Sequence, residues 1–553
     1  MPLRRCSVPI AFRRKAVSIP LGVLVTFAVY AFWDLEQPPF DSGVVSWPHI
    51  PALYPASPPE KMSLPELDAP TFPTPSQQDP FCAKRFSPAY LEELRNHAIQ
   101  YCNPVDGSQP QSKITCFHAH VRDDNSADSF CFASGATWDS KEQKFRLDCP
   151  NIRQPDVNET ARGLEPFGSI TASWFETGPK RVFSKFVTLS KGGGPPAPES
   201  KWPDKPQERD SFVILVKREG NNNLWHSLME IWSMLNSIDA LRISRIGDMG
   251  SRKSDASAPF YQTPADVDNT YIVMLDDYAE ESTFDLWRFF SRHPIVKLKD
   301  MIDNLSLVPE PLKSATANII VPMAGASNPL WQNDWAVRDC REAPLLNLLV
   351  RRIFEHYQVP LEAGPRRIAP NDDKDITVTF IDRRGTRQLL NHAPLFEAVQ
   401  ARFPNVVIKS VDFATLSLPD QLRLAQSTDV LVGVHGAGLT HTMFMRANAG
   451  AVVEIQPENM GHKGFRNLAA MTGHRYFSAQ AEVVLPEDET EETVSGGSTE
   501  GEEVKESGVA RRNDPDKPWQ SSHVRMEEDR FLALMDVAIK SLYNEGMRNH
   551  YIV

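Results

Sequence analysis

The sequence predicts an α/β protein with two Rossmann-like domains that face each other across a cleft, after an N-terminal membrane anchor and a stem. Two blocks, roughly 211–360 and 370–485, alternate uninterrupted apolar strands with helical segments. Such strands are typical of a parallel sheet whose two faces are both covered by helices. An apolar run and a proline-rich segment lie ahead of both blocks.

The first 33 residues have the pattern of a membrane anchor. A basic segment, residues 1–15, precedes an uncharged run from Ala16 to Trp33 that ends in aromatic residues. As a helix this run would extend about 27 Å, close to the ~30 Å of a bilayer core. Basic residues before the run and acids after it predict a cytosolic tail at 1–15 and a transmembrane signal-anchor at 16–33. A cleaved signal peptide is the alternative.

Either alternative places the body in the secretory lumen, and the anchor predicts a single-pass type II protein of the Golgi or endoplasmic reticulum membrane. Residues 34–80 hold 12 prolines and are expected to form an extended stem. The next region, 81–210, holds five of the seven cysteines, and with Cys340 it gives an even lumenal number that suits disulfides. Fifteen pairings of six cysteines are possible. Sequons at Asn158 and Asn304 are candidate N-glycosylation sites.

Each block is expected to form one domain, 211–365 and 366–485. In the first, we expect strands at 211–216, 270–275 and 318–325 and helices at 222–236 and 344–357. In the second, we expect strands at 375–381, 405–411, 430–434 and 450–455, with helices at 395–403, 419–427, 464–471 and from about residue 439. Residues 486–520 are acidic and are expected to be a disordered insertion, and 521–553 should hold a final helix. The net charge of −12 argues against nucleic acid as a partner.

A histidine and two glycines end one strand of the second block, in the order His435, Gly436, Ala437, Gly438. Ligands of open α/β sheets bind beyond the carboxyl ends of the strands. Glycines at that place let the backbone approach a phosphate, and the following helix would present N–H groups to it. His435 could donate a hydrogen bond to a phosphate oxygen. A plain turn with a satisfied histidine is the alternative interpretation.

Two further strand ends in the same block carry charge. Arg383 and Arg387 follow one strand and could neutralise a diphosphate, although a solvated basic turn would look the same. Glu454 ends another strand and could hold ribose hydroxyls, although a salt-bridged surface acid is the alternative. Together with the glycines, these residues predict a nucleotide diphosphate site.

Three segments carry a resemblance to a known family: FIDRRGTRQLLN at 380–391, STDVLVGVHGAGLTHTMFM at 427–445 and AVVEIQP at 451–457. They resemble glycosyltransferase family 61. The resemblance implies a GT-B fold and an inverting transfer from a nucleotide sugar. It also implies that Arg383, Arg387 and His435 lie near the donor diphosphate and that Glu454 lies near the nucleoside. Gln388 stands where relatives often have another arginine, so the division of labour among the arginines stays open.

We therefore expect an inverting glycosyltransferase that moves a sugar, first of all GlcNAc or xylose, from a UDP-sugar to a hydroxyl of a secretory protein or its glycan. On this reading 366–485 is the nucleotide-sugar-binding domain and 211–365 the acceptor side. The chain would contact the membrane through residues 16–33. A non-catalytic lumenal protein that binds a nucleotide sugar or a glycan is one alternative, and a glycan hydrolase with paired carboxylates is another.

The transfer needs a base for the acceptor hydroxyl, which we expect in the first block. His226 and Glu230 lie four residues apart on one face of a predicted helix. Asp276, Asp277 and Asp285 are further candidates. A core histidine is the alternative for His226.

Arginines and helix N-termini could replace a metal, so neither a metal nor another cofactor is expected. The Asp-x-Asp at 266–268 precedes a strand instead of following it, and the adjacent Asp276 and Asp277 would diverge in an extended chain.

Overall fold

The computed structural model describes residues 79–102, 112–124, 126–190, 211–220, 223–245, 259–314, 316–332, 334–362, 375–484, 522–543 and 550–551. The expected tail, anchor and acidic insertion, and the stem up to residue 78, lie outside the described residues. Across the described ranges, no helix combines the length and apolarity needed to cross a membrane.

A nine-stranded mixed sheet holds the first block together with the cysteine-rich region. Its main path runs β1-β2-β3-β9-β6-β7-β8, and β4 and β5 extend from β3. The strands are β1 (Ala98–Gln100), β2 (Lys113–Ala119), β3 (Asp128–Asp139), β4 (Lys144–Asp148), β5 (Val187–Ser190), β6 (Phe212–Val216), β7 (Thr270–Met274), β8 (Val296–Lys297) and β9 (Ala317–Val321). β9, β6, β7 and β8 are parallel, and β3 pairs antiparallel with β9.

The three apolar strands expected in the first block correspond to β6, β7 and β9. The cysteine-rich region 81–210 supplies β1 to β5 to the same sheet. The joint is the pairing of Cys131 to Ala133 with Val321 to Ile319. Because these partners lie far apart in the sequence, no local sequence pattern predicts that they pair.

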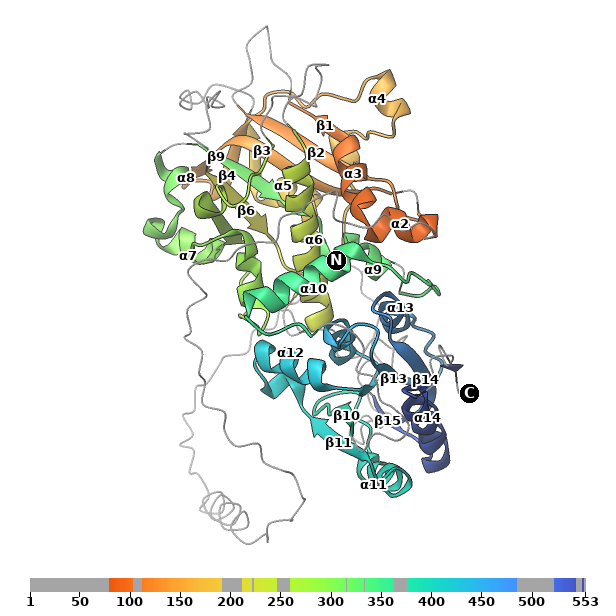
Figure 1. The fold of residues 1–553 in the computed structure, drawn as a ribbon. Helices are drawn as coiled ribbons and strands as arrows, with labels where there is room; N and C mark the ends of the chain where they lie inside the picture. The colour runs from red at the N-terminus through yellow and green to blue at the C-terminus, as the bar shows by residue number, and fades with distance from the viewer. Residues whose placement is uncertain are drawn as a thin grey trace, which may run out of the picture. The chain divides into compact units, whose positions relative to one another are not determined.

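Helices cover both faces of this sheet (Figure 1). Phe212 and Ile214 of β6 face a core shared with α3, α6 and α10, while Val213 and Leu215 face a core shared with α5, α7 and α8. This alternation follows from the two-residue period of a strand. The α-helices of this part are α2 (Pro80–Phe86), α3 (Pro88–Asn96), α4 (Val157–Ala161), α5 (Gly178–Lys185), α6 (Leu224–Ile243), α7 (Leu298–Asp303), α8 (Glu310–Ser314), α9 (Pro329–Gln332) and α10 (Pro344–His356).

The second block forms a seven-stranded sheet in the order β11-β10-β12-β13-β14-β15, with β16 paired to β14. Neighbouring strands from β11 to β14 in this order are parallel, whereas β15 is antiparallel to β14. The strands are β10 (Ile376–Ile381), β11 (Val406–Val411), β12 (Val430–Val434), β13 (Ala451–Pro457), β14 (Arg475–Val484), β15 (His523–Arg525) and β16 (His550–Tyr551). An α/β class, with mostly parallel apolar strands, is therefore confirmed.

Helices again cover both faces of the sheet. Apolar residues of α11 and α14 share a core with Val430 and Val432, and those of α12 and α13 share the opposite core with Leu431 and Val452. The helices are α11 (His392–Arg402), α12 (Leu418–Ser427), α13 (Gly464–Met471) and α14 (Glu528–Ser541), the last being the expected C-terminal helix. Short 3-10 helices are η2 (Phe167–Ser169), η3 (Trp174–Glu176), η5 (Val267–Asn269), η6 (Phe284–Phe290), η7 (Leu305–Leu307), η8 (Gly325–Ser327), η9 (Phe413–Thr415) and η10 (Ala437–Phe444).

One hydrophobic core joins elements of the two sheets. It contains residues of α6 and α10 together with residues of α12, α13 and η10. Trp225 of α6 and Phe465 of α13 contact each other edge to face, with ring centroids 5.5 Å apart. The N-terminal turn of α6 therefore lies against the second sheet's helices.

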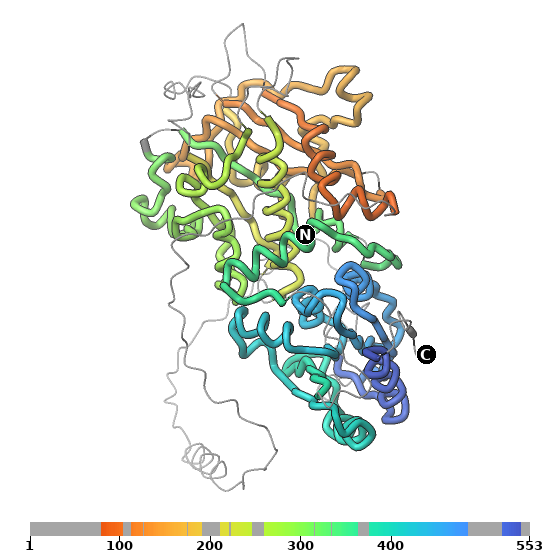
Figure 2. Tube along the Cα trace, in the orientation of Figure 1, coloured from red at the N-terminus to blue at the C-terminus, as the bar shows by residue number. Residues whose placement is uncertain are grey.

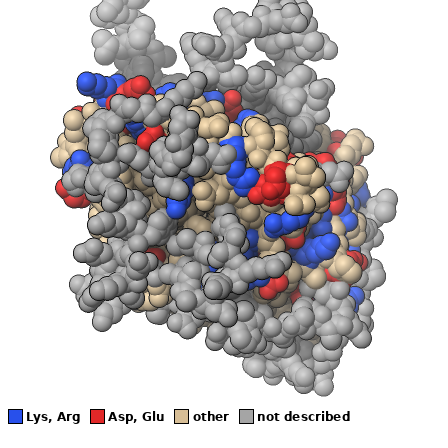
Figure 3. Space-filling model, turned by 90° about the horizontal axis from the view of Figure 1, so that it is seen from above, with Lys and Arg blue, Asp and Glu red and all other residues tan. Residues whose placement is uncertain are grey.

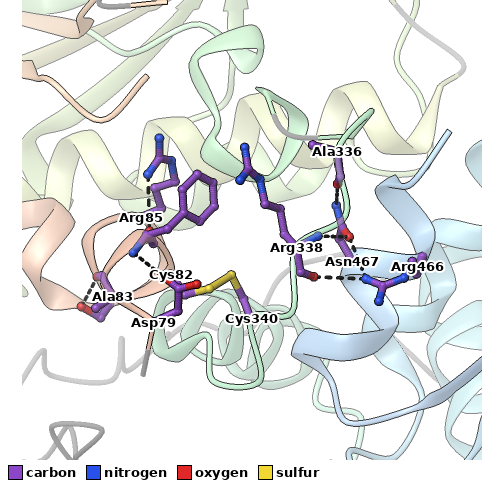
Figure 4. Close-up of a disulfide and its surroundings, with 11 residues drawn as sticks. Asp79, Cys82, Ala83, Arg85, Ala336, Arg338, Cys340, Arg466 and Asn467 are labelled. Carbon is purple, nitrogen blue, oxygen red and sulfur yellow. Dashed lines mark hydrogen bonds between the residues drawn. A yellow bond between two sulfur atoms is a disulfide. The ribbon is translucent and has the colours of Figure 1, made fainter. Parts of the chain in front are cut away.

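Three disulfides pair the six cysteines, as an oxidising compartment would allow: Cys82–Cys340, Cys102–Cys149 and Cys116–Cys131. The first ties α2 to the segment before α10, and Figure 2 shows these two distant parts of the chain side by side. Next to it, the backbone N–H of Arg338 donates to Asn467 Oδ1 at 2.9 Å, and Asn467 donates to the carbonyl of Ala336 at 2.8 Å (Figure 4). The disulfide and α13 thus hold opposite ends of one short segment.

Charge on the described surface is mixed. Figure 3 shows basic and acidic side chains interspersed over the described part of one face.

Candidate functional site

His435 ends β12 and is buried at 5 % exposure. Its backbone N–H donates to the carbonyl of Ile455 at 2.9 Å, which fixes the strand end. Its Nδ1 lies 2.5 Å from Oε1 of Glu454 on the neighbouring strand β13. Burial lowers the pKa of His435, and the hydrogen bond to Glu454 offsets part of that shift.

Glu454 lies beneath His435 and has no exposed surface. One carboxylate oxygen contacts His435, and the other accepts a hydrogen bond from the hydroxyl of Tyr476 on β14. Burial alone would raise the pKa of Glu454, but the bonds from His435 and Tyr476 bring it below its usual value. A ribose cannot reach a carboxylate in this position. Glu454 instead orients His435, and the ionised carboxylate requires the proton of the His435 ring on Nδ1.

Arg383 and Arg387 converge on the backbone of Gly436. A Cβ added to Gly436 would lie 2.7 Å from Nη1 of Arg383 and 2.9 Å from Nη1 of Arg387. Arg387 Nη1 also donates to the carbonyl of His435 at 3.1 Å. Burial and the neighbouring charge of Arg383 lower the pKa of Arg387 to about 9. The structure thus brings both predicted arginines and the strand-end histidine to one place.

The backbone at this place is unusual. Gly436 has φ 146° and ψ −177°, a conformation that is essentially restricted to glycine. Arg387 has a φ of +58°, which is uncommon for a residue with a side chain, and its N–H donates to the carbonyl of Ser522 at 2.9 Å. Two constrained residues that face each other are typical of a binding site.

Ala437 and Gly438 begin the 3-10 helix η10, where we expected an α-helix from about Leu439. A Cβ on Gly438 would lie 2.7 Å from Cγ2 of Ile381, a buried residue of β10. Glycine at 438 is therefore required by packing against the sheet, whereas glycine at 436 makes room for the guanidinium groups. Gly436 is the N-cap residue of η10 and has no side chain, so it makes no side-chain hydrogen bond to the first N–H groups of η10.

Aromatic contacts connect this place with the start of α6. Phe465 of α13 lies 5.4 Å from the ring of His435, measured between centroids, and 5.5 Å from the ring of Trp225. His462 lies 4.7 Å from His435 and forms an ion pair of 3.1 Å with Asp334. His226, the residue after Trp225, is thus close to the second sheet's strand ends.

His226 has the same type of partner as His435. Its Nδ1 lies 3.2 Å from Oε2 of Glu219, a fully buried carboxylate. Its ring packs against Trp331 with centroids 4.3 Å apart, and its side chain is 27 % exposed. A histidine whose Nδ1 is held by a carboxylate presents Nε2 for proton transfer.

Glu230 lies beneath this pair instead of beside the solvent. Its Oε1 accepts the backbone N–H of Glu219 at 2.8 Å, and its buried Oε2 has no hydrogen-bond partner among the described residues. Burial and the charge of Glu219 raise the pKa of Glu230 well above its usual value. It borders a cavity of about 20 Å³, which has room for about one water. Glu230 therefore supports the Glu219–His226 pair from below.

The three aspartates lie elsewhere. Asp276 accepts bonds from Nε and Nη2 of the buried Arg218, at 3.0 and 2.7 Å, which occupy its carboxylate. Asp277 is exposed beside it. This arrangement is a structural ion pair, and it leaves Asp276 unsuited to act as a base.

Asp285 is exposed on η6, and its charge acts on His356 of α10. One turn earlier on α10, Arg352 binds Asp239 of α6 at 2.7 Å. Asp239 is roughly 20 Å along α6 from His226, at 1.5 Å per residue. The structure therefore does not place Asp285 beside His226.

Both sequon asparagines are exposed, Asn158 on α4 and Asn304 before η7. Three residues of the site were missed from the sequence: Glu219, His462 and Tyr476. Glu219 follows β6 closely and could have been found by the strand-end rule that identified Glu454. No local signal marks His462 or Tyr476, because only tertiary packing brings them to His435.

The sequence of this chain is similar to that of known proteins. Residues 273–452 match the family model described as Glycosyltransferase 61. Residues 273–452 are therefore similar to glycosyltransferase family 61. The matched span includes Arg383, Arg387 and His435, ends two residues before Glu454, and excludes His226.

The family 61 resemblance predicted from the sequence is thus confirmed. The chain is 26% identical over 225 residues to the EGF domain-specific O-linked N-acetylglucosamine transferase of Drosophila melanogaster, with 39% of each chain covered. It is 27% identical over 226 residues to that of Pan troglodytes and over 227 residues to that of Mus musculus, with 40% of each chain covered. The chain therefore spans about two fifths of the length of these relatives.

Proposed function

We propose that this chain is an inverting glycosyltransferase that moves a sugar from a UDP-sugar to a hydroxyl of a secretory protein or its glycan. The observation that carries the proposal is the convergence of Arg383 and Arg387 on Gly436, at 2.7 and 2.9 Å from the position of an added Cβ. Charge builds up on the diphosphate as the glycosidic bond breaks, and preorganised cations stabilise that charge.

The electrostatics of the arginines support an anion here. Two guanidinium groups held close together repel each other, so burial first and the charge of Arg383 second lower the pKa of Arg387. A diphosphate between them would offset that repulsion and favour the charged form of both groups. The start of η10 adds backbone N–H groups to the same place. On this proposal residues 366–485 bind the nucleotide sugar.

His435 has a more specific role than the sequence predicted. With Glu454 ionised and the ring proton on Nδ1, a neutral His435 offers Nε2 only as an acceptor. A bound diphosphate would favour the protonated ring, since an anion raises the pKa of a neighbouring histidine. We therefore assign His435 as a group that binds a proton together with the diphosphate, and Glu454 as the residue that orients it.

The base for the acceptor hydroxyl is His226, held by Glu219 at 3.2 Å. His226 belongs to the first sheet's helix α6, and Trp225 next to it contacts Phe465 beside His435. This supports a GT-B arrangement in which the acceptor approaches from the first sheet and the donor from the second. Metal independence belongs to the same proposal, because Asp276, the strand-end carboxylate of the first block, is bound by Arg218.

GlcNAc is the first sugar to test, because the relatives named above are N-acetylglucosamine transferases, and xylose is the second. The membrane anchor at 16–33 and a lumenal body in the Golgi or endoplasmic reticulum are part of the proposal. They rest on the sequence pattern, and the three disulfides are compatible with them.

The decisive experiment incubates the purified chain with a panel of UDP-sugars and secretory glycoprotein acceptors and measures UDP release and sugar incorporation. Equal UDP release by the chain and by Arg387→Ala would refute the assignment. Binding of UDP without turnover on any acceptor would indicate the non-catalytic alternative. Release of free sugar from a glycan without UDP would indicate a hydrolase.

A further inference from the structure

A second cluster of chemically active side chains lies on the first sheet, away from the arginines. It contains Glu93 on α3, His97 at the end of α3, and His120 just after β2. Each residue offers one ligand atom, and these atoms all lie within 4.8 Å of one another. β1 and β2 form one edge of the first sheet, whereas Arg387 and His435 belong to the second sheet.

The geometry within the cluster suits coordination. His97 Nδ1 lies 2.9 Å from the backbone oxygen of Glu93 and 3.2 Å from its Oε1. A backbone carbonyl that binds Nδ1–H is a usual partner of a metal-ligating histidine and leaves Nε2 for the metal, so Oε1 of Glu93 would turn from Nδ1 toward the ion. The rings of His97 and His120 are 5.0 Å apart at an interplanar angle of 68°.

His120 supplies an independent observation. Both of its ring nitrogens are buried, and neither has a hydrogen-bond partner among the described residues. A neutral imidazole has one N–H donor and one nitrogen acceptor. Burying either of them without a hydrogen-bond partner costs free energy. A metal ion bound to one ring nitrogen would supply the missing partner.

We propose that Glu93, His97 and His120 form a zinc site. Two imidazole nitrogens and one carboxylate are a ligand set that zinc prefers, and three protein ligands leave a fourth position for water. The ion would join the C-terminal end of α3 to the end of β2. The proposed ion does not depend on the proposed transferase activity.

The test measures zinc bound to the full chain after removal of metal with a chelator and dialysis against zinc chloride. A Cys6→Ser background removes the cysteine that takes no part in the three disulfides. We expect about one zinc per chain, and a loss of zinc affinity of roughly tenfold or more in His120→Gln. The matched control is His293→Gln, because that ring stacks on Tyr271 at 3.9 Å, outside the cluster.

Glu93→Gln provides a second variant if His120→Gln does not fold, because Glu93 is partly exposed and the amide keeps its shape. X-ray absorption should show only nitrogen and oxygen ligands at about 2.0–2.2 Å. A sulfur ligand at about 2.3 Å, or full zinc affinity in folded Glu93→Gln and His120→Gln, would overturn the proposal. UDP affinity should be unchanged in both variants, which separates this test from the donor site.

Discussion

Replacement of Gly436 by alanine should weaken UDP binding more than it weakens the fold. The new methyl group would lie 2.7 Å from Arg383 Nη1 and 2.9 Å from Arg387 Nη1, so both guanidinium groups must move. Since these are the ends of flexible side chains, they can move, but they then leave the place where they converge. One displaced charge-assisted hydrogen bond costs about 1.5–3 kcal/mol. We therefore expect the Kd of UDP to rise roughly 10- to 100-fold.

The same substitution also strains the backbone. At φ 146° and ψ −177°, a residue with a side chain costs about 1–3 kcal/mol. A matched control must carry a similar loss of stability without touching the arginines. Gly438→Ala provides it, because its methyl group would lie 2.7 Å from Cγ2 of the buried Ile381. Overpacking of this kind typically costs about 1–3 kcal/mol.

The assay measures UDP affinity by titration calorimetry and stability by thermal unfolding, on both variants at a temperature where each is folded. Gly438→Ala should lower the Tm, and it should weaken UDP binding less than Gly436→Ala does, because it leaves both guanidinium groups in place. The double variant Ile381→Ala, Gly438→Ala should lose less stability than the sum of the losses in the two single variants, because the two residues share one contact. Unchanged UDP affinity in folded Gly436→Ala would refute the diphosphate site.

Three further predictions concern single side chains. Arg387→Ala should reduce transfer roughly a hundredfold to a thousandfold in a folded protein, whereas the exposed Arg384→Ala should retain the rate of the unchanged chain; equal losses would contradict a specific site. Glu454→Gln removes the charge that partly offsets the lowered pKa of His435. The pH at which UDP affinity changes with the protonation of His435 should therefore move to a lower value. A weaker UDP affinity with no shift in that pH would instead favour contact between Glu454 and the nucleoside. His226→Ala should reduce kcat roughly a hundredfold or more while UDP affinity stays the same, and a normal kcat on the best acceptor would exclude it as the base.

Much of the second domain can be read from the sequence alone. The apolar runs at 375–381, 430–434 and 450–455 predict β10, β12 and β13, because a strand covered on both faces must be apolar throughout. Parallel strands end at one edge of a sheet, so residues that follow them in the sequence meet there. Arg383, Arg387 and His435 could be predicted to meet for this reason, and the structure brings them together.

Chemical roles at that edge depended on tertiary structure. Glu454 occupies a strand end, as predicted, yet it has no exposed surface, and its two oxygens contact His435 and Tyr476. The sequence shows that a carboxylate is present at this position, but it does not show whether the carboxylate is buried. Burial determines whether the carboxylate contacts a ligand or a neighbouring side chain. Gly436 and Gly438 likewise look equivalent in the sequence, and only their neighbours distinguish their roles.

The first domain shows the same division more strongly. The strands β6, β7 and β9 follow from local apolar patterns. The addition of β1 to β5, the choice of three disulfides among fifteen possible pairings, and the approach of Glu219 to His226 all join residues that are separate in sequence. Local propensity is decided by a few neighbouring residues. Contacts across the fold are decided by the packing of the whole core, which only the tertiary structure specifies.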